Sequence, residues 1–358
     1  MTKTKDRKFQ RRFDDHFLGD HLSNPRSLIG ALFKRWELPG QPGTAVPGAP
    51  VPLRISIRDG YVNFYANGQS VAELATPNGE PRVSLSSKYL VAALSGFLPS
   101  KTSGDYSIIV GERLFVDHPQ KLLSHIVNAT LDHCGKEKCF VEHLQARNKN
   151  VVEVEMALPG DSRLLKEVKG KDGDVTMKKV APRMDVVVVH VDQGRPSLDF
   201  WEAKLATNGE LRSTIKADGS GKDPHVFGQL KAYENWMRLP GRKEEVKAAF
   251  AESWVILDRM AETWGKTGEA RTLWQKLIKL RDCKPSFNPQ PGVVIANYDP
   301  TCPSYSPYER DAKSFEDKCH HDHISHHDRL KRVATVRPVS GVECPEGIFD
   351  VPLPGDRI

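Results

Sequence analysis

The chain has 358 residues, a formal net charge of +6, 39% hydrophobic residues and 27% charged residues. This balance excludes a chain that is disordered throughout, and no apolar run reaches the roughly 18 residues of a membrane-spanning helix. The charged N-terminus lacks the apolar segment of a secretory signal, so we expect a cytoplasmic protein whose six cysteines are reduced thiols. The positive charge is compatible with a polyanionic partner.

Residues 1–115 are predicted to form a small N-terminal accessory domain of the α+β class. Short helices open it, and a connector rich in proline and glycine follows over 39–52. Apolar and polar residues then alternate over Arg54–Ala75, with Asn67-Gly68 between two of the runs. That dipeptide favours a tight hairpin turn, so we expect a small antiparallel sheet, and then a helix near Ser87–Phe97.

Residues 116–358 are predicted to form an α/β domain with a C-terminal extension. Apolar residues recur at helical spacing in some segments, and others are short runs typical of strands. The expected elements are helices from Pro119 and over Lys138–Arg147, strands over Val151–Leu158, Met184–Val191 and Ser197–Leu205, helices over Val226–Met237 and Arg242–Arg281, and a strand over Gly292–Tyr298.

Three charged residues on the second and third strands carry the chemistry. Alternation along the third strand points Glu202 and Lys204 from the same face. Asp185 begins the preceding strand, and a hairpin between the two strands brings it near Glu202. Two adjacent carboxylates repel each other unless a cation lies between them, and their oxygens suit Mg²⁺ or Mn²⁺. Lys204 would then orient the attacking water or stabilise the charge that develops on a phosphate.

This arrangement resembles the PD-(D/E)XK nuclease superfamily, whose motif is an acid followed by (D/E)-x-K. Asp185 and Glu202-Ala203-Lys204 match the motif, whereas Met184 stands where the superfamily name has proline. The resemblance implies a restriction-endonuclease-like core, in which helices flank a central mixed sheet. It also implies Mg²⁺- or Mn²⁺-dependent hydrolysis of DNA.

A second motif resembles the Q-x-x-x-Y signature of the RecB-like exonuclease branch. Gln229 and Tyr233 are four residues apart, so they share one face of the predicted helix after the E-x-K strand. They are expected to reach back over the metal site. The superfamily often adds a glutamate from the helix before the first strand; Glu142 is our candidate, and Glu153 and Glu155 are the alternatives.

Two polar segments admit two interpretations each. The segment 206–224 is either a connector or a substrate-contacting flap, in which Arg212, Lys216 and Lys222 would bind nucleic acid. The histidine-rich segment Cys319–Asp328 is either a cluster of metal-binding side chains or a hydrophilic helix face; it lacks the H-E-x-x-H pattern of zinc proteases, and we interpret it as the helix face.

The function that these residues predict is a metal-dependent deoxyribonuclease, in an exonuclease-like role and in DNA processing or phage defence. The alternatives are an inactive nucleic-acid-binding subunit that retains the fold, and a subunit whose N-terminal domain recruits a protein partner. The strandedness of the DNA and the oligomeric state stay open.

Overall fold

The computed structural model describes residues 6–41, 51–90, 101–103, 106–169, 175–206, 208–211, 214–215, 221–280, 284–298, 330, 334–341, 345–354 and 358. The chain divides into two compact units. Unit 1 comprises Met1–Phe9, Val154–Val246 and Pro285–Ile358, and unit 2 comprises Gln10–Glu153 and Lys247–Lys284.

Unit 2 contains an antiparallel six-stranded sheet in the order β1-β2-β3-β4-β6-β5. Asn67 and Gly68 have φ values of 49° and 67° in the turn between β2 and β3, so the predicted hairpin is confirmed. The strands are β1 (Arg54–Ile57), β2 (Tyr61–Ala66), β3 (Gln69–Ala75), β4 (Arg82–Ser86), β5 (Lys101–Ser103) and β6 (Tyr106–Val110). Short 3-10 helices are η1 (His16–His21), η2 (Pro77–Gly79), η3 (Ser87–Tyr89) and η5 (Gly111–Leu114).

The α-helices among the described residues of unit 2 are α1 (Leu28–Arg35), α2 (Pro119–Leu131), α3 (Lys136–Arg147), α5 (Arg242–Thr263, from Lys247 onward) and α6 (Glu269–Lys279). A helix was predicted near Ser87–Phe97; the described residues there include only the 3-10 helix η3, and residues 91–100 lie outside the described part of the chain. The single helix predicted over Arg242–Arg281 is instead two helices. Gly265 and Gly268, with φ values of 59° and 152°, separate them because an α-helix does not accommodate positive φ.

Unit 2 is larger than the 1–115 domain predicted from the sequence because α2 and α3 belong to it. Asn67 Nδ2 donates a hydrogen bond of 2.9 Å to Thr130 Oγ1 on α2. Arg54 Nε on β1 lies 3.0 Å from Glu142 Oε1 on α3. These side-chain contacts connect both helices to the N-terminal sheet, so the predicted boundary at 115/116 falls inside a compact unit.

Cys134 and Cys139 are joined by a disulfide, contrary to the expected reduced thiols.

Unit 1 is an α/β structure built on a mixed sheet in the order β16-β15-β11-β10-β7, with β14 beside β11. β11 pairs antiparallel with β10 and parallel with β15, and β15 pairs parallel with β16. The strands are β7 (Val151–Ala157), β10 (Arg183–Asp192), β11 (Arg195–Leu205), β14 (Ser286–Phe287), β15 (Gly292–Ala296) and β16 (Val336–Val339). The α/β class is confirmed and strands lie at the three predicted positions, but β7 and β10 do not follow one another directly, because two further strands lie between them.

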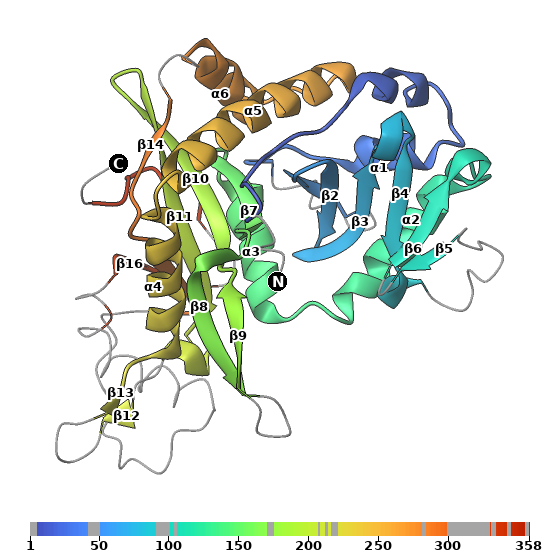
Figure 1. Cartoon of the computed structure of the whole chain (residues 1–358). Helices are drawn as coiled ribbons and strands as arrows, with labels where there is room; N and C mark the ends of the chain where they lie inside the picture. The colour runs from blue at the N-terminus through green and yellow to red at the C-terminus, as the bar shows by residue number, and fades with distance from the viewer. Residues whose placement is uncertain are drawn as a thin grey trace. The chain divides into compact units, whose positions relative to one another are not determined.

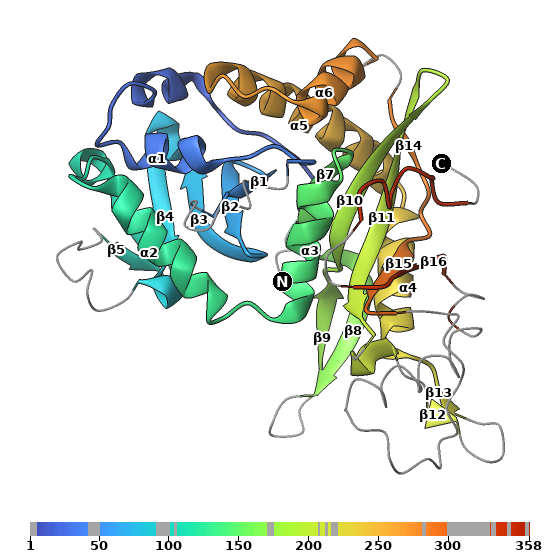
Figure 2. The same cartoon turned by 180° about the vertical axis from the view of Figure 1, so that it is seen from behind.

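Helix α4 (His225–Met237) covers one face of this sheet (Figures 1 and 2). The rings of Phe200 on β11 and Tyr233 on α4 have centroids 5.2 Å apart. On the opposite face, the ring centroids of Trp201 and of Phe349 in the C-terminal segment lie 5.4 Å apart. Successive residues of β11 therefore face different layers, and Glu202 and Lys204 share the α4 side with Phe200.

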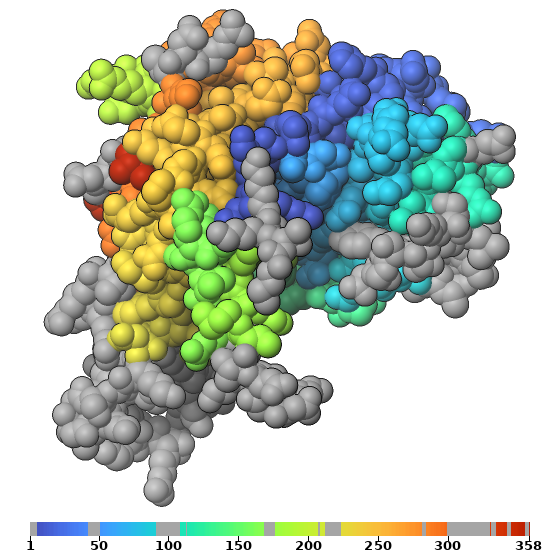
Figure 3. Space-filling model, in the orientation of Figure 1, coloured from blue at the N-terminus to red at the C-terminus, as the bar shows by residue number. Residues whose placement is uncertain are grey.

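A long β-hairpin between β7 and β10 was not predicted. It consists of β8 (Asp161–Lys169) and β9 (Val175–Val180), and its surface lies next to that of α4 (Figure 3). A short pair, β12 (Thr214–Ile215) and β13 (Gly221–Lys222), follows the 3-10 helix η6 (Gly209–Leu211). Among the described residues, none of the helices combines the length and the apolar character that crossing a membrane requires.

Candidate active site

Asp185 and Glu202 meet where β10 and β11 pair. The register sets Val186 opposite Trp201, which brings Asp185 to the level of Glu202. Asp185 Oδ2 accepts a hydrogen bond of 2.9 Å from the backbone N–H of Ala203. Glu202 is buried, with 5% of its surface exposed. The structure thus brings together the two carboxylates that the sequence paired.

Negative charge accumulates around Asp185. Burial, followed by the charges of Glu202 and Glu155, raises the pKa of Asp185 to about 8. Glu155 lies on β7 and has a φ of 54°, a left-handed conformation that non-glycine residues adopt at a cost of about 1 kcal/mol or more. The sequence named Glu155 only as an alternative to Glu142, yet its carboxylate is the one that acts on Asp185.

Lys204 lies between two carboxylates. Its Nζ is 2.8 Å from Glu202 Oε1 and 3.0 Å from Glu210 Oε2. Lys204 is buried, with 4% of its surface exposed, and a buried ammonium group needs such partners because desolvation disfavours its charge. The E-x-K motif therefore forms an ion pair within its own strand, and η6 supplies a second acid.

Glu210 also contacts α4. Its Oε1 lies 3.3 Å from His225 Nδ1, and Gln229 Nε2 donates a hydrogen bond of 3.5 Å to its Oε2. Burial acts to raise the pKa of Glu210, but hydrogen bonds and charges from Lys204 and His225 outweigh it and lower that pKa below its ordinary value. Glu210 and His225 were not singled out from the sequence, because neither belongs to a motif.

The two motif residues of α4 have different environments. Tyr233 is fully buried against Phe200, so its ring packs the helix onto the sheet. Gln229 is half-buried, and its buried Oε1 has no hydrogen-bond partner among the described residues. Gln229 thus contacts the acid that pairs with Lys204, whereas Tyr233 is a core residue.

Glu142 and Glu153 belong to unit 2, where each is paired with arginine. Glu142 accepts a hydrogen bond from Arg54, and Glu153 contacts Arg11 at 2.5 Å and also Arg58. These ion pairs give both glutamates a structural role within unit 2. Of the three glutamates considered, the structure groups only Glu155 with Asp185.

The residues predicted to contact nucleic acid lie outside the description. Arg212 and Lys216 are not among the described residues, and only the backbone of Lys222 is described, in β13. The histidine-rich segment Cys319–Asp328 also lies outside the described residues.

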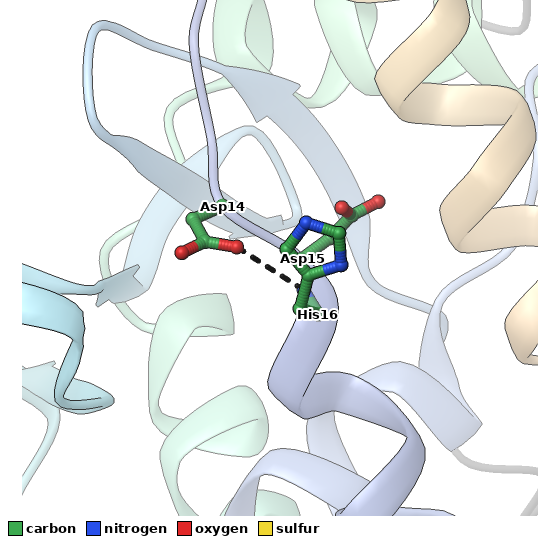
Figure 4. Close-up of side chains that lie close together, drawn as sticks. All are labelled: Asp14, Asp15 and His16. Carbon is green, nitrogen blue, oxygen red and sulfur yellow. Dashed lines mark hydrogen bonds between the residues drawn. The ribbon is translucent and has the colours of Figure 1, made fainter.

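A second group of side chains that could bind a cation lies in unit 2. Asp14, Asp15 and His16 each place a ligand atom within 4.8 Å of the others (Figure 4). Asp15 is already paired with Arg259 at 3.1 Å, and Asp14 accepts a hydrogen bond of 3.3 Å from the backbone of His16. The group lies at the start of η1 and is readily explained by these contacts.

Three acids surround the Asp185 site, although among the described residues only Asp14, Asp15 and His16 place three ligand atoms within 4.8 Å of one another. Asp185, Glu202 and Glu155 offer carboxylate oxygens, the ligands that Mg²⁺ and Mn²⁺ prefer. Burial first, and then the charges of Glu202 and Glu155, disfavour the ionised form of Asp185 and raise its pKa. A cation bound there would stabilise the ionised carboxylate.

A cleft of about 680 Å³ opens beside the N-terminal end of α4. Its described lining includes His225, Phe227, Lys231 and Gln290. His225 lines this cleft and also contacts Glu210, whereas Lys204 and Glu202 are not among the residues that line it.

Comparisons of the chain with protein-family models, with curated proteins and with solved structures found no match.

Proposed function

We propose that this chain is a metal-dependent DNA nuclease that hydrolyses phosphodiester bonds on the face of β11 beneath α4. The observation that carries the proposal is the Asp185–Glu202 carboxylate pair beside the buried Lys204. Adjacent acids with an unfavourable local charge are costly to keep in a fold, and such sites are often functional. The resemblance to the PD-(D/E)XK superfamily, and to its restriction-endonuclease-like core, supports the same interpretation.

In this proposal Asp185 and Glu202 hold Mg²⁺ or Mn²⁺, and Glu155 is the nearby third acid. The cation would supply positive charge for the phosphate and lower the pKa of the attacking water. Lys204 would donate a hydrogen bond to a phosphate oxygen as negative charge develops there. Gln229 would orient Lys204 and Glu210 from α4.

The substrate in this proposal is DNA, and the cleft beside His225 would accommodate nucleotides next to the scissile phosphate. The net charge of +6 favours a polyanion. A role in DNA processing or phage defence, in the cytoplasm and with a protein partner bound by unit 2, belongs to the same proposal.

The test is incubation of the purified protein with labelled linear and circular DNA and with RNA, in Mg²⁺, Mn²⁺ or EDTA. We expect DNA to be cleaved with either metal and to stay intact in EDTA. Cleavage that persists in EDTA would contradict the metal requirement. Binding without cleavage in all conditions would instead favour the inactive DNA-binding subunit.

A further inference from the structure

Three hydrogen-bond donors from two elements converge on the carboxylate of Glu210. Lys204 Nζ on β11 lies 3.0 Å from Oε2, Gln229 Nε2 on α4 donates to the same oxygen at 3.5 Å, and His225 Nδ1 lies 3.3 Å from Oε1. Both oxygens of one anion are thus held at once. A phosphate offers the same kind of acceptor oxygens and more negative charge, so these donors suit it equally well.

The position of Glu210 is set by local structure. The backbone N–H of Glu210 donates to Asn208 Oδ1 at 2.9 Å, and that of Leu211 donates to Asn208 O at 3.1 Å. Leu211 is buried in the apolar cluster under α4. A short turn anchored on both sides therefore directs the Glu210 carboxylate at the donors.

Glu210 is the acid that can leave Lys204. The Glu202 side chain is 7% exposed, whereas that of Glu210 is 36% exposed. A more exposed ion pair stabilises the structure less, because water screens the two charges and solvates the carboxylate once it is released. An incoming anion would therefore displace Glu210 and leave the Lys204–Glu202 pair intact.

We propose that Lys204, His225 and Gln229 form a phosphate-binding subsite, which the Glu210 carboxylate fills until a substrate phosphate displaces it. The inference rests on the proposed function for the identity of the substrate, and it adds His225 as a binding residue and Glu210 as an internal competitor. His225, which is 73% exposed and lines the cleft, is the donor that an entering phosphate reaches from that side.

The test is a titration of the full chain with inorganic phosphate in EDTA, at ionic strength matched with chloride, followed by thermal unfolding. A ligand that binds only the folded state raises the unfolding temperature, even at millimolar affinity. Glu210→Gln keeps the shape of the side chain and removes the competing charge. We expect its dissociation constant for phosphate to fall about tenfold, which corresponds to about 1.4 kcal/mol. An unchanged or weaker affinity would overturn the proposal.

Two further variants sharpen the result. Glu252→Gln makes the same charge change at an exposed residue of α5 that does not line the cleft, and it should leave phosphate affinity unchanged. His225→Ala added to Glu210→Gln should abolish the gain. A gain as large in Glu252→Gln, or one that survives His225→Ala, would contradict the subsite.

Should Glu210→Gln fail to fold, Glu210→Asp replaces it. The shorter side chain holds Lys204 and His225 less well, so phosphate affinity should rise to a smaller extent, and no rise would overturn the proposal. Because phosphate binding is measured in EDTA, it is independent of cleavage. A protein without nuclease activity that still gains phosphate affinity would refute the proposed function alone, whereas an active nuclease without that gain would refute the subsite alone.

Discussion

The Asp185 carboxyl group makes the fold sensitive to pH. Its pKa is raised to about 8 in the folded protein, from a value near 3.9 in an unfolded chain. The folded state therefore binds a proton that the unfolded state releases, and stability falls as the pH rises from about 4 to about 8. For one proton, the loss is at most about 1.4 kcal/mol per pH unit.

Asp185→Asn should remove this dependence. In EDTA, we expect the variant to be more stable than the natural protein at pH 8, with the difference shrinking toward pH 4. Chemical denaturation at several pH values between 4 and 8 measures this difference in the free energy of unfolding. Asp192→Asn, at the exposed end of the same strand, is the matched control and should leave the pH profile unchanged. Parallel profiles for the natural protein and Asp185→Asn would contradict the account.

Lys204→Met tests the proposed catalytic lysine. Methionine keeps the apolar part of the buried side chain and removes the charge that would stabilise the transition state, so kcat should fall on the order of 10²-fold or more. Affinity for a long DNA should change much less, because many phosphates contribute to it. Lys276→Met, at an exposed lysine of α6 that does not line the cleft, is the control and should retain near-normal kcat. A normal cleavage rate in Lys204→Met would make the lysine a bystander.

At the scale of the element, helix α4 combines packing and polar contacts. Tyr233 is buried on Phe200, while Gln229 reaches Glu210. Gln229→Ala should lower kcat severalfold or more, because Glu210 and Lys204 lose a positioning partner. Tyr233→Phe keeps the ring and its packing volume, so it isolates the hydroxyl group.

If the Tyr233 hydroxyl serves the substrate, Tyr233→Phe should lower activity without changing the unfolding temperature. Tyr298→Phe makes the same chemical change in a buried tyrosine of the cluster under α4 and is the control. Full activity in both Gln229→Ala and Tyr233→Phe would reduce the Q-x-x-x-Y match to coincidence. The Asp185, Glu202 and Lys204 assignment would be unaffected.

The elements around the site were predictable because their signals are local. The apolar run in β10 reflects burial on both faces, and both strands appear at the positions that the sequence predicted, with every residue of β11 after Arg195 buried. The proximity of Asp185 and Glu202 follows from one hairpin register. The face shared by Glu202 and Lys204 follows from the two-residue period of a strand.

The rest of the site depends on tertiary structure. Glu210 reaches Lys204 only because η6 turns back over β11, and no sequence spacing encodes that contact. Glu142 and Glu155 carry the same side chain on adjacent elements, so only the fold separates them. The β8–β9 hairpin was missed because its strands are charged and exposed, without the apolar period that marks a buried strand.

At the scale of the whole molecule, both compact units are discontinuous in sequence. A fragment covering 116–358 would retain α2 and α3 but lose the sheet of unit 2. The apolar residues that α2 buries, Leu122, Leu123, Ile126 and Val127, would then be exposed. Burying each of these side chains stabilises the folded state by about 1.5–3 kcal/mol.

We therefore expect the fragment 116–358 to aggregate or to lose cooperative unfolding, while the full chain unfolds cooperatively in the same buffer. Sedimentation and circular dichroism on heating measure the two properties. A monodisperse fragment with a sharp unfolding transition would show that residues 116–358 fold alone, as the sequence suggested.

The measurement that tests the central claim most directly is a crystal structure of the protein soaked in Mn²⁺, with the metal located by its anomalous scattering. We predict an ion bound by oxygens of both Asp185 and Glu202 at about 2.0–2.6 Å, with Glu155 close by and Glu142 still paired with Arg54. Metal bound only elsewhere, for instance at Asp14–His16, with none between Asp185 and Glu202, would contradict the proposed active site.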